Sequence, residues 1–233
     1  MFSSNSIVMI LAAALLNLDR QVFGPFMLGR PLVAGFIMGL LSGELAAGAW
    51  MGLSVELLWL AAMPLGGQLT PNAGLAVSAA LIALLGSSFA PALGACQTQA
   101  GQVVAFLTVP FWAWAFTYID KISRRLVPPQ LARARADLAE GRDPRFFRRN
   151  LYGLCSTLGF SLAGLALAVL LNTSLLNLVV RLAPDIVLLN LDSLFTFIPF
   201  LGLLGMAVFL EAKTVNFYLG GLLASLLALS AVR

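Results

Sequence analysis

Residues 18–76 read LDRQVFGPFMLGRPLVAGFIMGLLSGELAAGAWMGLSVELLWLAAMPLGGQLTPNAGLA and combine long apolar runs with scattered charges and a Pro/Gly-rich break. The charges that interrupt the apolar runs are Asp19, Arg30, Glu44 and Glu56. Residues 63–74 cannot form one regular helix, because two prolines and three glycines lie within them. Charge and irregular backbone at bilayer depth are tolerated only where they face protein or a water-filled cavity. We therefore expect a transported solute to bind in this stretch.

The whole chain is too apolar for a soluble globular surface. Its 233 residues are 60% hydrophobic and only 10% charged, with a mean hydropathy of +0.95, whereas globular domains carry about 25% charged residues. Several apolar runs approach the roughly 20 residues that a spanning helix needs. The runs are residues 7–18, 31–41, 48–63, 73–93, 103–119, 151–171, 194–210 and 215–232. The sequence predicts an all-α, polytopic membrane protein with broken or re-entrant helices.

Basic residues divide the chain into parts. Nine of its fourteen lysines and arginines lie between Asp120 and Asn150. The positive-inside rule predicts that this loop is cytoplasmic. Nucleic-acid binding is the competing interpretation, but the flanking apolar blocks favour the topological one. We expect a membrane half at residues 1–119, a basic loop at 120–150 with an interfacial helix near 129–140, and a second membrane half at 151–233.

The chain contains no histidine, which excludes phosphohistidine chemistry and imidazole bases from this polypeptide. Its two cysteines, Cys96 and Cys155, are spaced for neither a metal cluster nor a redox pair, and we interpret them as packing thiols. Neither a metal nor an organic cofactor is expected.

Proline and glycine recur in patterns along both halves. Breaks at residues 63–67 and 198–202 are typical of inverted-repeat transporters, although such segments also occur singly in membrane helices. Glycines at four-residue spacing allow helix backbones to approach closely, and these glycines are Gly35, Gly39, Gly43, Gly48 and Gly52. We interpret this row as a packing surface.

Five side chains form the candidate binding site. Glu56 lies in an apolar helix, and Trp59 follows one turn later on the same face. Gln68, Thr70 and Asn72 then alternate through the broken segment. Carboxylate, amide and hydroxyl groups beside an aromatic ring suit a neutral sugar, which needs hydrogen bonds in both directions. The alternative is that Glu56 pairs with Arg30 or another buried cation, and that the polar loop only satisfies backbone ends.

Asp19, Arg20 and Arg30 fall where the first apolar segment ends. An ordinary interfacial ion pair explains these charges as well as a binding site does.

The chain resembles the IIC membrane subunit of the mannose/fructose/sorbose family of the bacterial sugar phosphotransferase system. The resemblance is carried by Arg30-Pro31-Leu32, Gly39, Gly43-Glu44, Gly48, Gly52, Glu56-Leu57, Gly66 and Pro71-Asn72-Ala73-Gly74-Leu75-Ala76. Glu56 matches the family's acidic position and residues 68–72 match its substrate-loop region. The chain departs from the family in having Asn72 where members commonly have aspartate, and in lacking an asparagine near Pro64.

This resemblance implies an elevator-type transporter subunit in the bacterial cytoplasmic (inner) membrane. It implies a IID membrane partner, a hexose substrate and a homo-oligomer of the IIC–IID unit in the lipid bilayer. A separate IIB protein, phosphorylated through IIA, would phosphorylate the sugar, so no phosphoryl-carrying residue is expected on this chain. The alternative functions are a substrate-binding module of an ATP-driven vitamin or metal-ion importer, and a non-transporting membrane scaffold or sensor.

Overall fold

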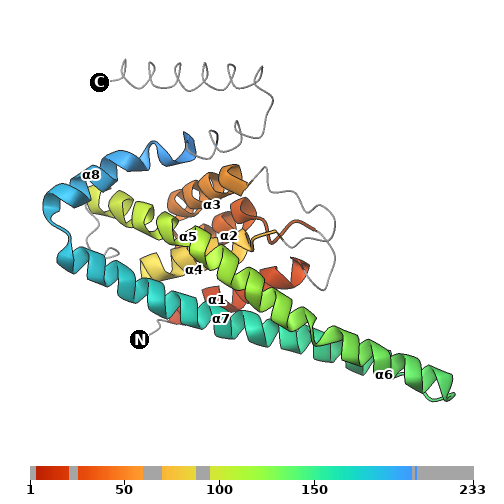
Figure 1. The fold of residues 1–233 in the computed structure, drawn as a ribbon. Helices are drawn as coiled ribbons and strands as arrows, with labels where there is room; N and C mark the ends of the chain where they lie inside the picture. Colours follow the sequence, from red (N-terminus) through yellow and green to blue (C-terminus); the bar gives the residue numbers. More distant parts are fainter. Residues whose placement is uncertain (1–3, 21–25, 60–69, 88–94, 201–202, 204–233) are drawn as a thin grey trace, which may run out of the picture.

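A computed structural model describes residues 4–20, 26–59, 70–87, 95–200 and 203. All regular secondary structure within these ranges is helical, which confirms the predicted all-α class (Figure 1). The helices are α1 (Ser4–Leu18), α2 (Pro31–Ser42), α3 (Leu45–Trp59), α4 (Ala73–Leu85), α5 (Ala95–Arg124), α6 (Val127–Ala139), α7 (Phe146–Leu182) and α8 (Asp185–Phe195).

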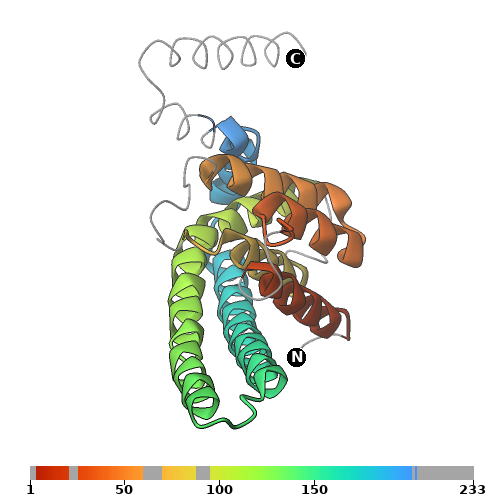
Figure 2. The ribbon, with the colours of Figure 1, turned by 90° about the vertical axis from the view of Figure 1, so that its right-hand side faces the viewer.

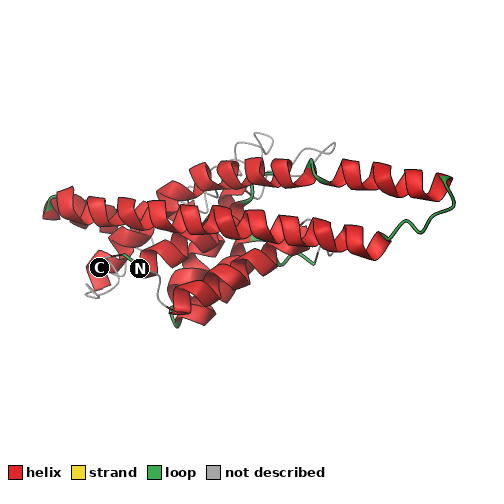
Figure 3. Ribbon diagram, turned by 90° about the horizontal axis from the view of Figure 1, so that it is seen from below, coloured by secondary structure: helices red, strands yellow, loops and turns green. Residues whose placement is uncertain are grey.

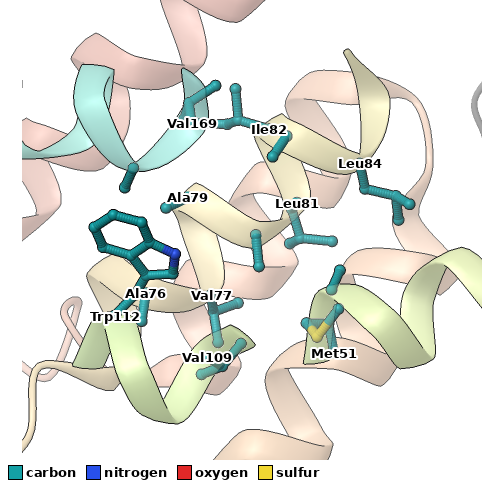
Figure 4. Close-up of a cluster of buried hydrophobic side chains, with 14 of the residues drawn as sticks. Met51, Ala76, Val77, Ala79, Leu81, Ile82, Leu84, Val109, Trp112 and Val169 are labelled. Atoms are coloured by element: carbon teal, nitrogen blue, oxygen red, sulfur yellow. The ribbon is translucent and has the colours of Figure 1, made fainter. Parts of the chain in front are cut away.

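Helix α4 forms the centre of the fold. Every residue from Ala73 to Leu84 is buried, as expected for a helix that is apolar on all sides. Helices α1, α2, α3, α5 and α7 all pack against it. Figure 4 shows α4 side chains such as Ile82 and Leu81 between Trp112 and Val169 on one side and Met51 on the other. The short α4 is therefore held by packing around its full circumference.

Helices α2 and α3 form a close hairpin through backbone contact between glycines. A Cβ placed on Gly48 would overlap the Gly35 carbonyl oxygen, and one on Gly52 would lie 2.7 Å from the Pro31 carbonyl oxygen. Glycine at these positions permits an approach that any side chain would block, and the predicted packing surface is confirmed there. Gly43 differs, because it lies in the left-handed region at φ +80°, and a Cβ there would meet nothing within 4 Å. Gly43 ends α2 instead of packing.

Two helical stretches among the described residues are long and apolar enough to cross a membrane, namely Gln99–Ala139 and Phe146–Leu182. The four shorter apolar helices have 10–17 residues, fewer than the roughly 20 needed to cross a bilayer core unaided. Helices α5 and α7 run side by side past α4, as Figure 2 shows. A bundle of two long and several short helices is consistent with the predicted broken or re-entrant segments.

The basic region is mostly helical. Helix α6 confirms the helix expected near residues 129–140, and with the start of α7 it projects beyond the shorter helices (Figure 3). Arg149 of α7 joins the two helices of this projection. Its Nη1 donates to the Gln130 carbonyl of α6 at 3.1 Å, and its guanidinium pairs with Asp137 of α6. Its Nε also donates to the Pro144 carbonyl at 2.8 Å. Gly141 makes the turn between the helices at φ +69°.

One face of α5 exposes a row of large apolar and aromatic side chains. Leu107, Phe111, Trp114 and Tyr118 are 62–69% exposed and recur every three or four residues. Such a row is unfavourable in water and suits lipid or a membrane partner. Tyr118 lies three residues before Lys121, the first cation of the basic region, and aromatic residues are enriched at membrane–water interfaces.

Some sequence predictions concern residues outside the described part. The first proline break, Gln68 and the side chain of Cys96 lie there, as do most of residues 201–233. The second break is helical at 198–200 after a turn at 196–197. The inverted repeat therefore remains a prediction. Cys155 is described and is exposed on α7, so its interpretation as a packing thiol is wrong.

Candidate functional site

Glu56 lies in the last turns of α3 and faces the start of α2. Its Oε1 accepts a hydrogen bond from the Arg30 guanidinium at 3.3 Å, and its Oε2 accepts one from the Leu32 backbone N–H at 3.3 Å. The alternative pairing of Glu56 with Arg30 is thus present. The Glu56 side chain is 16% exposed and the Arg30 side chain 52% exposed. A charged pair with one open partner retains donors and acceptors that a polar ligand can reach.

Residues 26–32 hold Arg30 in this position. The Asp19 carboxylate accepts from the backbone N–H groups of Phe26 and Leu28, each at 2.9 Å. Asp19 is 6% exposed and therefore organises the loop from inside the fold. A Cβ on Gly74 would overlap the Gly29 carbonyl oxygen, so the loop backbone rests directly on the first turn of α4. The charged residues at the end of the first apolar segment therefore have different partners. Asp19 accepts hydrogen bonds from backbone N–H groups, and Arg30 pairs with Glu56.

Asn72 caps α4 and is almost completely buried, at 2% exposed. Its Oδ1 accepts from the Leu75 N–H at 3.3 Å, as a helix N-cap does. Its Nδ2 donates to Asn17 Oδ1 at 2.8 Å and to Asp120 Oδ2 at 2.9 Å. A direct contact between this side chain and a sugar would require some of these bonds to open.

The Arg20 guanidinium joins Asp120 to the end of the broken segment. Its Nε lies 3.7 Å from Asp120 Oδ2. It donates to the Thr70 carbonyl, to Thr70 Oγ1 at 3.2 Å and to the Pro71 carbonyl at 3.3 Å. The segment therefore enters α4 with its last carbonyls bound by a cation that a carboxylate neutralises.

The network continues to α5 and α7. The Asn72 backbone N–H bonds to Thr117 Oγ1 at 2.9 Å and to the Ala113 carbonyl at 3.1 Å. Asn17 Nδ2 donates to Ser161 Oγ at 2.8 Å. Beside Asn17 and Asn72 lies a cavity of about 10 Å³, at the lower bound of the space that one water molecule needs. Four helices thus share one buried polar cluster.

The predicted site residues lie in two neighbouring groups. Glu56 lies on α3 and pairs with Arg30, and the partly buried Trp59, three residues later on α3, packs against the hydrophobic core. Thr70 and Asn72 lie at the Arg20–Asp120 pair. Residues 29–30 connect the groups, because Gly29 contacts Gly74 while Arg30 reaches Glu56. Gln68 lies outside the described residues.

Sequence reasoning did not select the buried partners of this cluster, which are Asn17, Thr117, Asp120 and Ser161. A signal was available in part, because Asn17 and Asp120 are polar residues at the ends of long apolar runs.

Comparison with known proteins gives one extensive match. A family model described as the PTS system sorbose-specific IIC component matches residues 4–232. Among curated proteins, none matches this chain.

Proposed function

Because this chain belongs to the family of phosphotransferase-system sorbose-specific IIC components, and so is a sugar-translocating IIC subunit of a mannose-type system, we propose that it binds a hexose between Glu56 and residues 68–72. The site is proposed to comprise Glu56, Trp59, Gln68, Thr70 and Asn72. The observation that carries this proposal is the Glu56–Arg30 pair, whose arginine is half exposed at the start of a helix hairpin.

The chemistry of this pair matches a sugar. A carboxylate accepts hydrogen bonds from adjacent hydroxyls, while a guanidinium donates to hydroxyl oxygens. The neighbouring Trp59 offers an apolar ring for the C–H face of a hexose. Thr70, whose hydroxyl accepts a hydrogen bond from Arg20, would contact the sugar from the second group of site residues. Asn72 contributes by fixing the start of α4, since its side chain already bonds to protein.

The wider assembly follows from the family and the surface of the chain. We propose a IID membrane subunit as partner, a homo-oligomer of that unit, and a multi-pass arrangement in the bacterial inner membrane. The exposed row Leu107–Phe111–Trp114–Tyr118 supports contact with lipid or a membrane subunit. The basic α6 region supports a cytoplasmic position for residues 120–150, close to phosphorylated IIB. IIB, charged through IIA, would transfer the phosphoryl group, and this histidine-free chain would carry none.

The site is tested by a carboxylate replacement with a matched control. Glu56→Gln removes the charge while keeping the shape, and Glu44→Gln does the same at an exposed glutamate in the α2–α3 turn. We expect binding of radiolabelled L-sorbose, D-mannose or D-fructose, whichever the native protein binds, to weaken about tenfold or more in Glu56→Gln, because a hydrogen bond to a charged group contributes about 1.5–3 kcal/mol. Glu44→Gln should bind as the native protein does. Unchanged affinity in a folded Glu56→Gln variant would remove Glu56 from the site.

The mode of energy coupling is tested in inverted vesicles. Vesicles that contain this chain and a IID subunit, supplied with phosphoenolpyruvate and the phosphorylating proteins, should produce sugar phosphate. Uptake that instead follows ATP hydrolysis would support the alternative, an ATP-driven importer.

A further inference from the structure

We infer that Arg20 is a positioning residue that latches the end of the substrate segment to the base of α5 through Asp120. The inference rests on the proposed role of residues 68–72 in sugar binding. The contacts that support it are separate from the Glu56–Arg30 pair, because they are made by Arg20 with Asp120 and with residues 70–71, directly before α4. The latch consists of Arg20, Asp120 and the backbone of Thr70 and Pro71.

The carbonyls of Thr70 and Pro71 lie just before the first turn of α4, outside its helical ladder. The Pro71 carbonyl accepts one local bond, from the Ala73 N–H at 2.9 Å. Pro71 also keeps Thr70 out of helical geometry. Arg20 supplies donors to both carbonyls and to Thr70 Oγ1. A planar guanidinium with five N–H donors can serve several acceptors at once, which a lysine ammonium does less well.

Asp120 makes this arginine tolerable inside the fold. The Arg20 side chain is 19% exposed and that of Asp120 is 2% exposed. A buried charge is costly unless it is paired and hydrogen-bonded. Asp120 also accepts from Asn72 Nδ2, so the carboxylate holds both sides of the Thr70–Asn72 turn. The segment is thereby attached to α5 through the Asn72 side chain and through Arg20, in addition to the bonds from the Asn72 backbone N–H to Thr117 Oγ1 and the Ala113 carbonyl.

The latch couples the segment to the C-terminal end of α5. Asp120 lies one turn before the end of α5, next to the basic α6 region. Residues 70–72 therefore move together with the end of α5 while the latch is closed. Arg20 bonds to Thr70 and Pro71 of the segment, whereas Arg30 bonds to Glu56. Arg20 therefore affects sugar binding indirectly, by fixing the position of the segment.

The test measures exposure of the segment directly. Cys96 and Cys155 are replaced by serine, Thr70→Cys is introduced, and the rate of labelling by a soluble maleimide is measured in the IIC–IID complex without sugar and, for the parent protein, with sugar. The double variant Arg20→Gln/Asp120→Asn opens the latch without leaving an unpaired charge.

Two further variants complete the design. The control is Arg142→Gln/Glu140→Gln, which removes an exposed ion pair at the hairpin tip and leaves Asp137 paired with Arg149. Arg20→Lys keeps the charge but reduces the number of carbonyls that can be bound. It also decides the outcome if the double variant does not fold.

We expect labelling at position 70 to become about tenfold faster in the latch variant, with an intermediate rate in Arg20→Lys and an unchanged rate in the control. The dissociation constant for the sugar should rise by about tenfold in the latch variant, without loss of the folded protein. Labelling of both Arg20 variants within twofold of the parent rate would overturn the latch. If labelling accelerates but sugar fails to protect the introduced thiol in the parent protein, the latch stands and the sugar-binding role of the segment fails.

Discussion

Asn72→Asp places a second carboxylate against Asp120 and tests the buried polar cluster. The native Nδ2 donates to Asp120 at 2.9 Å and to Asn17 at 2.8 Å. An aspartate removes both donors and puts a negative charge in their place. Its N-cap acceptor for Leu75 is retained, so the change isolates the two bonds made by Nδ2.

The expected destabilisation follows from these distances. Two unit charges about 3 Å apart repel by about 6 kcal/mol at an effective dielectric constant of about 20. The nearby Arg20 offsets part of this repulsion, and protonation of one carboxyl group limits the rest. We expect a net loss of about 3 kcal/mol, which lowers the melting temperature by about 6–12 °C for a chain of this size.

A second substitution should restore stability. In Asn72→Asp/Asp120→Asn, the amide at 120 donates to the carboxylate at 72, so the pair is reversed. Asn17 can turn its amide so that Nδ2 faces residue 72, while the Ser161 hydroxyl donates to its oxygen. We expect at least half of the lost stability to return.

Thermal unfolding in detergent, followed by tryptophan fluorescence, measures all four proteins of this double-mutant cycle. An interaction energy of about 2 kcal/mol or more between positions 72 and 120 is expected. If the two single effects simply add, the geometry of Asn72 and Asp120 does not describe the protein and the cluster is wrongly assigned.

Two further substitutions test the packing. Gly48→Ala should destabilise the α2–α3 hairpin by about 2–3 kcal/mol, because its Cβ would overlap a backbone carbonyl, whereas Gly153→Ala, with nothing within 4 Å, should be neutral or slightly stabilising. Equal melting temperatures for these two variants would contradict the close hairpin. Trp112→Phe should cost about 1–3 kcal/mol by removing the 2.7 Å bond from Nε1 to Asn172, while Trp114→Phe, at a side chain 62% exposed, should change thermal stability little. A smaller loss in Trp112→Phe than in Trp114→Phe would contradict the buried hydrogen bond.

Local sequence features predicted much of the fold. The apolar runs gave the helical class because long hydrophobic segments need internally satisfied backbone, and the run beginning at Ala73 became the buried helix α4. The spacing of Gly35, Gly48 and Gly52 indicated close packing because a missing side chain has the same effect wherever the helix lies. Gly43 fits the same spacing but ends α2, because glycine is favoured both at helix ends and at close helix contacts.

The polar cluster could not be predicted in the same way. Asn17 and Ser161 are 144 positions apart, and Asp120 lies 48 positions from Asn72. No local periodicity links such residues, because their contact depends on how α1, α4, α5 and α7 pack. The Glu56–Arg30 pair was easier to anticipate, since an arginine 26 positions away was one of few cations available to an apolar helix.

The projecting hairpin amplifies small rotations at Asp120 into larger displacements at its tip. From this residue to the Gly141 turn the chain runs through the end of α5 and all of α6, about 30 Å at 1.5 Å per residue. A tilt of about 10° at the base would move the tip by about 5 Å, given that length. A pair of distance probes, one at the tip and one on the α2–α3 hairpin, would therefore report small rotations of the segment at residues 70–72 as displacements large enough to measure.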